Sequence, residues 1–272
     1  MHRVLAQVHA LVMVLSVASV GLPARAPSAQ GMMDHVDFDS PRMSGAELTR
    51  GQVEALLAEA GPRRAADLAD KSLNGLDLSG LDFTGADLRW ARLNRAKLVG
   101  ATLDGATLDL AWAIEADLRD ASLRGASLFQ AQLLRAKLDG ADLSGARVTG
   151  DFSGASLEGA RLAGVDGEPD MRNQSMGLMR AVFRSARMRD ADLSGARLAR
   201  ADLEFAKLQG ANLEGADLTR ALLGGANLTG AHLAGCDLTR ADIASTMLVG
   251  ISGKETLVGL DRTLNRNRAF LD

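Results

Sequence analysis

Residues 86–100 read ADLRWARLNRAKLVG, three copies of a five-residue unit with Ala at its first position and Leu at its third. The unit recurs from Ala66 to about Gly250. A period of five suits neither ordinary element. It would wind the Leu stripe around an α-helix, and on a flat strand it would send successive Leu residues to opposite faces. A chain that turns a corner once in each unit can bury every Ala and Leu, which predicts an all-β solenoid.

A second pattern predicts four units in each coil. If a coil takes 20 residues, residues 20 apart stack about 4.8 Å from one another. The residues just before the centres on one face are then Asp77, Lys97, Asp117 and Lys137. Their charges alternate in sign along the column, as cross-strand pairing favours.

The units resemble those of the pentapeptide-repeat family, A(D/N)LXX, for example at residues 86–90, 201–203 and 226–228. The resemblance covers about two thirds of the chain and implies a right-handed, quadrilateral β-helix, here of about nine coils. The best-understood members of that family mimic DNA and bind type II topoisomerases. Many others have no known activity, because a fold does not by itself define a function.

The N-terminus has the pattern of an export signal. Arg3 supplies a short basic region, residues 10–20 an apolar stretch, and residues 23–29 the small residues of a cleavage site. The apolar run is too short for a transmembrane span, so we expect none in the mature form. We therefore expect a periplasmic or secreted protein. If translation instead starts near Met32, the protein is cytoplasmic.

Two segments outside the repeat have the pattern of helices that cover the ends of the solenoid. Residues 44–47 (SGAE) form a capping box before a helix predicted at about 46–60. Residues 252–255 (SGKE) form another before a helix predicted near 253–268. The predicted organisation is a signal peptide (1–29), a linker with an N-terminal capping helix (30–65), the β-helix (66–250), and a C-terminal capping helix (251–272). Within the β-helix, residues 165–177 fit no repeat and form either an irregular coil or a protruding loop.

No set of residues has the spacing of a catalytic or cofactor site. The four His residues are scattered, and Cys236 replaces an inward Ala with no His or Asn placed to activate it. No Gly-rich phosphate loop precedes a helix. One His and three Asp residues in 34–39 match no known metal loop, so solvated charge is favoured there. We predict no enzyme, no cofactor and no small-molecule substrate.

Six apolar residues occupy positions that the repeat sends outward: Trp90, Leu110, Trp112, Ile114, Phe129 and Leu134. A contiguous exposed patch with two Trp residues is typical of an interface with a protein partner or a second copy. Two alternatives stay open. Ala113 replaces a central Leu, so Ile114 could turn inward and take Trp112 with it. The N-terminal helix or linker could also cover the patch.

A column of arginines at equivalent corners contains Arg180, Arg200, Arg220 and Arg240. Stacked like charges cost free energy unless counter-charges lie nearby. An acidic polymer would supply them, whether nucleic acid, acidic glycan or an anionic membrane surface. The alternative is that acidic residues on adjacent columns pair with the arginines, namely Asp202, Asp217, Asp237 and Asp242.

The sequence therefore favours a non-enzymatic, exported scaffold that mediates protein–protein or polyanion binding, with a possible homodimer. The alternative is a cytoplasmic DNA mimic that binds a type II topoisomerase (gyrase), as the family resemblance suggests. A DNA mimic would need a long surface of one acidic sign, whereas the repeat region mixes signs.

Overall fold

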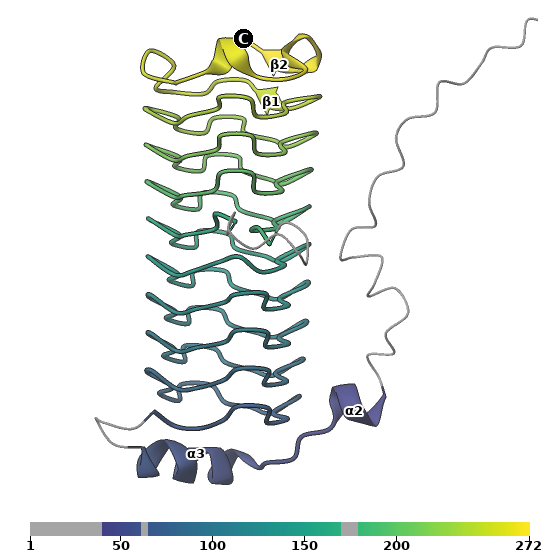
Figure 1. The fold of residues 1–272 in the computed structure, drawn as a ribbon, viewed down its shortest axis with the longest axis vertical. Helices are drawn as coiled ribbons and strands as arrows, with labels where there is room; N and C mark the ends of the chain where they lie inside the picture. Colours follow the sequence, from purple (N-terminus) through teal and green to yellow (C-terminus); the bar gives the residue numbers. More distant parts are fainter. Residues whose placement is uncertain (1–39, 61–64, 170–178) are drawn as a thin grey trace, which may run out of the picture. The chain divides into compact units, whose positions relative to one another are not determined.

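The five-residue units form coils that stack along one axis (Figure 1). The structure is a computed structural model and describes residues 40–60, 65–169 and 179–272. Parallel bridges join residues 20 apart through the N-terminal coils, and one such series runs through Asp77, Lys97, Asp117 and Lys137. The predicted charge column is therefore present.

Each rung is hydrogen-bonded to the rungs on both sides. The Lys97 N–H donates to the Leu76 carbonyl at 2.8 Å, and the Leu98 N–H donates to the Asp117 carbonyl at 2.7 Å. Most rungs make only a single bridge between turns, so the regular strands are short. Parallel stacking of backbone groups, continued from coil to coil, holds the rod together.

Ala and Leu fill the inside of the coils. Ala96 and Leu98 are typical, with 0% and 1% of their surfaces exposed. Each buried Leu contributes roughly 1.5–3 kcal/mol. Phe152 and Phe183 replace Leu on adjacent rungs, and their rings stack with centroids 4.9 Å apart.

The corners explain the remaining positions of the unit. Each corner needs one residue at positive φ, and Gly105 (φ 64°) is one of many glycines that serve there. The Asp or Asn at the second position accepts a hydrogen bond from the backbone two residues later. The Thr219 N–H donates to Asp217 Oδ1 at 2.8 Å, and the Thr229 N–H donates to the Asn227 side chain at 3.0 Å. The preference for Asp and Asn is thus a preference for this turn.

The register shortens by one residue after Val148. From Gln132, which bridges Asp151, to Arg147, which bridges Asp166, each bridge spans 19 residues, whereas the bridges before Gln132 span 20. Gly150 lies at the shortened corner, and a Cβ there would come within 2.6 Å of the Ala131 carbonyl oxygen. Only glycine fits that close approach of two rungs.

The irregular segment predicted at 165–177 does not add a rung. Asp166 bridges Arg197, 31 residues further on, so the regular coil continues to Gly167. The Ala181 N–H then donates to the Gly167 carbonyl at 3.2 Å, and the coil resumes. Residues 170–178, between these two, lie outside the described ranges.

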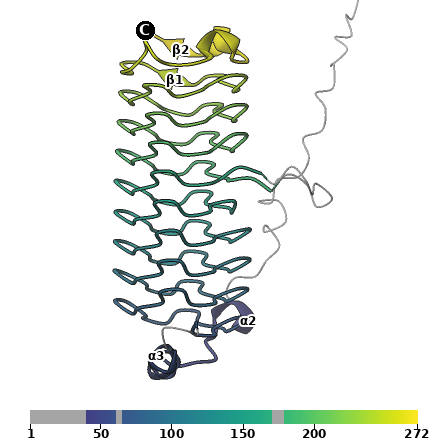
Figure 2. The same cartoon turned by 60° about the vertical axis from the view of Figure 1, so that its left-hand side comes forward.

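Two helices precede the first coil, α2 (Pro41–Ser44) and α3 (Arg50–Glu59). Both views show α3 across the end of the stack (Figures 1 and 2). Val53 of α3 is fully buried in the same apolar core as the first coils. The helix shields apolar groups that an end rung would otherwise leave open to water.

The capping box predicted at residues 44–47 is wrong, and α3 begins later than the predicted 46–60. Its capping box is formed by Thr49 and Gln52. Ala46 instead pairs antiparallel with Leu73 of the first coil. That extended pairing uses the backbone groups which a helix starting at residue 46 would need.

The predicted C-terminal helix near 253–268 is also wrong. The chain continues as a last, looser coil with two short 3₁₀ turns, η1 (Leu260–Arg262) and η2 (Arg266–Arg268). The strand β1 (Met247–Leu248) pairs in parallel with β2 (Phe270–Leu271) at its end.

Backbone pairing also explains why this helix does not form. Val258 bridges Asp237 and Leu264 bridges Asp242, so the backbone groups pair with the preceding coil. Within the described residues, no helix is both long and apolar enough to cross a membrane. The predicted signal peptide (1–29) and residues 30–39 of the linker lie outside the described residues.

Candidate functional site

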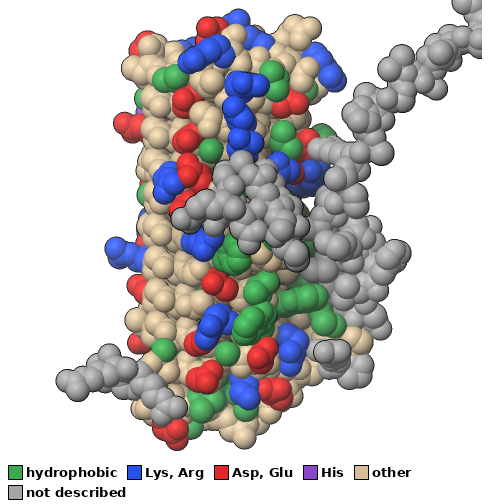
Figure 3. Space-filling view, viewed as in Figure 1, with side chains coloured by type: hydrophobic (Ala, Val, Ile, Leu, Met, Phe, Trp, Pro, Cys, Tyr) green, Lys and Arg blue, Asp and Glu red, His purple; other side chains and the backbone are tan. Residues whose placement is uncertain are grey.

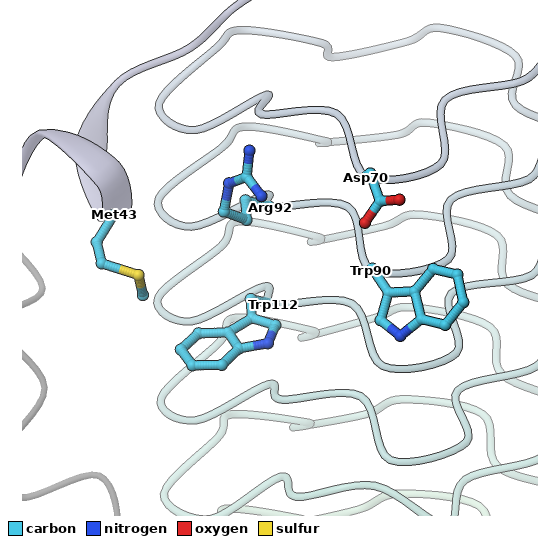
Figure 4. A pocket seen from close by; sticks show the side chains of 5 residues that line it. All are labelled: Met43, Asp70, Trp90, Arg92 and Trp112. Carbon is cyan, nitrogen blue, oxygen red and sulfur yellow. The ribbon is translucent and has the colours of Figure 1, made fainter.

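A groove of about 670 Å³ lies at the N-terminal end of the coils. Its lining residues are Met43, Asp70, Trp90, Arg92 and Trp112. In Figure 4, Met43 of α2 faces Arg92 and Trp112 on one wall, while Asp70 and Trp90 come from the neighbouring corner. The groove holds both tryptophans of the chain.

The coil register brings these side chains together. Arg92 and Trp112 are bridge partners on adjacent rungs. Asp70 (φ 62°) and Trp90 (φ 57°) occupy the same corner on adjacent rungs. A bulky residue at positive φ costs about 1–2 kcal/mol relative to ordinary backbone. Trp90 is still 47% exposed, so burial of its indole offsets little of that cost.

The groove contains an unused hydrogen-bond donor. Arg92 Nη2 is 3.9 Å from Glu47 Oε2, and Arg92 Nε is buried without a hydrogen-bond partner. At the groove edge, the Arg89 guanidinium lies 6.0 Å from the Trp90 ring centroid. Its hydrogen bond to Asp87 holds the pKa of that carboxyl below its ordinary value. The groove therefore combines indole surface with a partly exposed guanidinium, and the buried Nε of that guanidinium lies beneath it.

Four of the six predicted patch residues lie at the surface, with Trp90 exposed and Leu110, Trp112 and Phe129 partly exposed. The placement of Ile114 and Leu134 at the surface is wrong, since only 2% and 4% of their areas are exposed.

The backbone explains this inward turn. Side chains of this corner column lie along the rod: Asn94 Oδ1 accepts the Ile114 N–H at 3.1 Å, and Asn94 is itself 5% exposed. An apolar residue in the column is therefore removed from water. Ala113, small at the core position, is also buried at 2% exposure. Trp112 does not follow Ile114 inward.

Sequence reasoning missed Met43, Asp70 and Arg92 as groove residues. The 20-residue register could have identified two of them, because Asp70 stacks with Trp90 and Arg92 stacks with Trp112. Met43 could not have been found in this way, since it precedes the repeat. Its position follows from the pairing of residues 44–47 with the first coil.

The predicted arginine column lies in the C-terminal half. Arg200, Arg220 and Arg240 occupy the same corner on successive coils, with φ of 64°, 59° and 61°. In Figure 3, Lys and Arg side chains gather in a column on the upper half of the view, while hydrophobic side chains gather on the lower half. Arg180 differs from the other three, because its Nη2 lies 3.3 Å from the buried carboxylate of Asp202.

The alternative for this column was that acidic residues on adjacent columns pair with its arginines. Among the described residues, Asp202 is the acid of the four that pairs with a column arginine, Arg180. Asp217 and Asp237 each accept the N–H of the Thr two residues later at 2.8 Å. Asp242 accepts the Ala244 N–H at 3.0 Å and a hydrogen bond from Asn265 at 2.8 Å. Across residues 40–60, 65–169 and 179–272, no ion pair to a carboxylate is found for Arg200, Arg220 or Arg240.

Among the residues that the structure describes, Cys236 and His232 do not come together in a reactive centre. Cys236 is fully buried, and burial raises the pKa of its thiol to about 12, so it stays protonated and unreactive. The His232 ring lies 2.9 Å from the Ser252 hydroxyl at the surface. No group of three or more His, Cys, Asp and Glu residues in the described part of the chain could hold a metal ion. The acidic segment 34–39 lies outside that part.

Stacked coils with an Ala and Leu core and with Asp and Asn turns define a β-solenoid repeat protein. The chain belongs to the pentapeptide-repeat family. The model described as Pentapeptide repeats matches it in eight copies, over residues 64–109, 114–150, 178–215 and 216–252.

Solved structures of this family are similar to the chain. HetL, involved in heterocyst differentiation regulation in the cyanobacterium Nostoc sp. strain PCC 7120, is 28% identical with a TM-score of 0.56. The match covers 82% of this chain and 95% of HetL. QnrB1, a plasmid-mediated fluoroquinolone resistance protein, is 17% identical over 71% of this chain and 91% of its own, with a TM-score of 0.33. No curated protein matches the chain.

Proposed function

We propose that this protein is a non-enzymatic, exported scaffold that binds a protein partner through the groove at Trp90 and Trp112. The observation that carries the proposal is the groove itself, which holds both tryptophans and leaves Trp90 47% exposed at a strained corner. Large aromatic side chains contribute a disproportionate share of interface free energy when a partner covers them.

The lining also defines the chemistry of the partner segment. Met43 and the two indoles favour an apolar or aromatic side chain. The Arg92 guanidinium, on a side chain that is 29% exposed, favours a carbonyl or carboxylate acceptor nearby. An extended segment with an apolar anchor and an adjacent acceptor supplies both. The rigid coils hold the groove in place before binding, which lowers the ordering cost of association.

Export is supported by the basic, apolar and small-residue pattern of residues 1–29. The right-handed course and the number of coils, about nine, rest on the family resemblance and belong to the same proposal.

The topoisomerase-binding alternative has less support. A DNA mimic presents a long surface of one acidic sign. Here basic and acidic side chains interleave: Arg119 pairs with Asp117 at 2.7 Å, and Glu115 lies between Arg95 and Arg135. The net charge of the whole chain is only −3.

Site-specific photo-crosslinking in cells tests the binding surface. A photoreactive phenylalanine in place of Trp90 should give an adduct with one identified protein. The matched control is the same residue in place of Phe205, which is 58% exposed at another corner with φ of 60°. No adduct at Trp90, or the same adducts at both positions, would contradict the proposal.

Fractionation of the full-length protein, with N-terminal sequencing, tests export separately. A shortened product outside the cytoplasm is expected. An uncleaved cytosolic product that starts near Met32 would contradict export and favour the alternative.

A further inference from the structure

Three arginines in the C-terminal half stack without an ion pair to any carboxylate among the described residues. Arg200, Arg220 and Arg240 lie at one corner of successive coils, about 4.8 Å apart along the rod. The series ends at Arg240: its N–H donates to the Arg262 carbonyl at 3.2 Å, as the Arg220 N–H donates to the Thr239 carbonyl, so Arg262 lies at the position before the corner. The Arg262 side chain is 59% exposed, and its acidic neighbour Asp261 is 3.9 Å away.

Another corner of the same rod shows what a neutralised column looks like. Arg95, Glu115 and Arg135 occupy equivalent positions on successive coils, with φ of 56°, 57° and 55°. Glu115 accepts hydrogen bonds from Arg95 Nε at 3.0 Å and from Arg135 Nη2 at 2.9 Å. The charge between the two arginines therefore has the opposite sign. At the Arg200 column, the middle position is Arg220.

The arginine column is unfavourable to the fold in two respects. Glycine serves the same corner position in many units without strain, whereas an arginine at positive φ is strained. Like charges on adjacent rungs also repel. Neither cost is offset by an ion pair among the described residues. A contact outside the fold would supply the missing anions.

The shape of the charged strip limits what that contact can be. Beside Arg220 and Arg240 the strip is one residue wide, because Asp217 and Asp237 lie three residues before them and Asp242 lies two residues after Arg240. Beside Arg200 the corresponding position is Arg197, whose guanidinium is already paired with Asp166 and Glu168. These carboxylates would repel a broad anionic surface such as a membrane or a nucleic acid duplex. Single-stranded nucleic acid is usually held by aromatic stacking as well, and the exposed Phe205 lies at a different corner. A thin linear polymer without bases fits the strip.

We propose that Arg200, Arg220 and Arg240 form a track for an acidic polysaccharide with one carboxylate per sugar. Each guanidinium binds a carboxylate through two parallel N–H donors, which a planar fork favours over an ammonium group. The track uses no groove residue, so it goes beyond the proposed function and either can fail without the other.

Titration of the full chain with polygalacturonate, in low salt, tests the track. Binding is expected, and the logarithm of the binding constant should fall with the logarithm of salt concentration with a slope on the order of −2 to −3. The variant R200Q/R220Q/R240Q should bind at least tenfold more weakly. The control R95Q/R135Q removes positive charge from the other corner described above. It should bind within twofold of the unchanged protein. If the triple variant folds poorly, the single charge reversal Arg220→Glu replaces it in the same binding comparison.

Three other probes decide the class of ligand. Neutral dextran should not bind, and single-stranded oligothymidylate and phosphatidylglycerol vesicles should bind more weakly than polygalacturonate. Equal binding by the triple variant and the control would overturn the track. Tighter binding of the oligonucleotide or the vesicles, lost in the triple variant, would overturn the assignment to a polysaccharide.

Discussion

Replacing Glu115 by arginine should convert the neutralised corner into a second column of three stacked arginines. Two charge attractions, to Arg95 and Arg135, become two repulsions. Unit charges about 4 Å apart in water interact by about 1 kcal/mol, and physiological salt reduces this by roughly half. Two lost attractions and two new repulsions therefore sum to about 2 kcal/mol. The side chains of Arg95, Glu115 and Arg135 are each more than one third exposed. Because exposed side chains can move apart, we expect the free energy of unfolding to fall by about 1 kcal/mol.

Thermal unfolding measures this difference. For a chain of this size, about 1 kcal/mol corresponds to a fall in Tm of about 2–4 °C. The difference should widen at low ionic strength and shrink in molar salt. The variant should also bind polygalacturonate more tightly than the unchanged protein, because the added column reproduces the proposed track. If Tm at low salt is unchanged, stacked charges on this rod do not repel measurably, and the argument for the arginine track loses its premise.

The same carboxylate gives a pH prediction. Hydrogen bonds from Arg95 and then Arg135 hold the pKa of Glu115 below its ordinary value of 4.5. A group whose pKa is lowered by folding stabilises the folded state above its unfolded pKa. That stability is lost as the pH falls through the lowered, folded pKa. Glu115→Gln should therefore be less stable than the unchanged protein at pH 7 and equally stable in strong acid. A difference that persists in strong acid would contradict the assigned pKa shift.

Three further measurements test the fold and the groove. Gly150→Ala should lower the free energy of unfolding by about 1–3 kcal/mol, because its Cβ would meet the Ala131 carbonyl oxygen at 2.6 Å. Gly145→Ala meets open space and should cost about 1–2 kcal/mol for its positive φ alone, so a smaller effect at Gly150 than at Gly145 would contradict the account of the shortened corner. Cys236 should resist alkylation at pH 8 until denaturant is added, and rapid labelling of the folded protein would show that the thiol is not buried. Trp90→Ser should change stability by less than about 0.5 kcal/mol, and a loss of several kcal/mol would show that the indole belongs to the core.

The repeat itself was predictable because one physical requirement recurs in every unit. Ala and Leu must be inward and one residue must adopt the corner conformation, so spacing alone predicts which residues stack. The charge series through Lys97 and Asp117 follows from that spacing. The inward turn of Ile114 and Leu134 did not follow, since it depends on how a corner side chain lies against the next rung.

Local helix signals failed where backbone pairing to a neighbouring coil competed with them. Residues 44–47 and 49–52 both have the spacing of a capping box, and the sequence could not choose between them. The bridge from Ala46 to Leu73 chooses the second. At the other end, residues 252–255 also fit a capping box. There the bridges to the preceding coil, such as Asp237 to Val258 and Asp242 to Leu264, span more than 20 residues. The apolar residues of this last coil are therefore spaced more widely than in a regular unit, and that spacing resembles the spacing of a helix.

The 20-residue register has a consequence for how the length of this protein can change. Deleting one whole coil, for example residues 206–225, would shorten the rod by about 4.8 Å and leave every remaining column in line. Deleting a single five-residue unit would shift all later columns to the neighbouring face. Bridges that run from Trp112 through Gln132, Asp151 and Val182 to Asp202 place the Trp90 corner and the Arg200 corner in one column. A five-residue deletion between them would move them to different corners. Length can therefore vary in steps of one coil without altering the pattern of the surface, whereas smaller steps redistribute it around the rod.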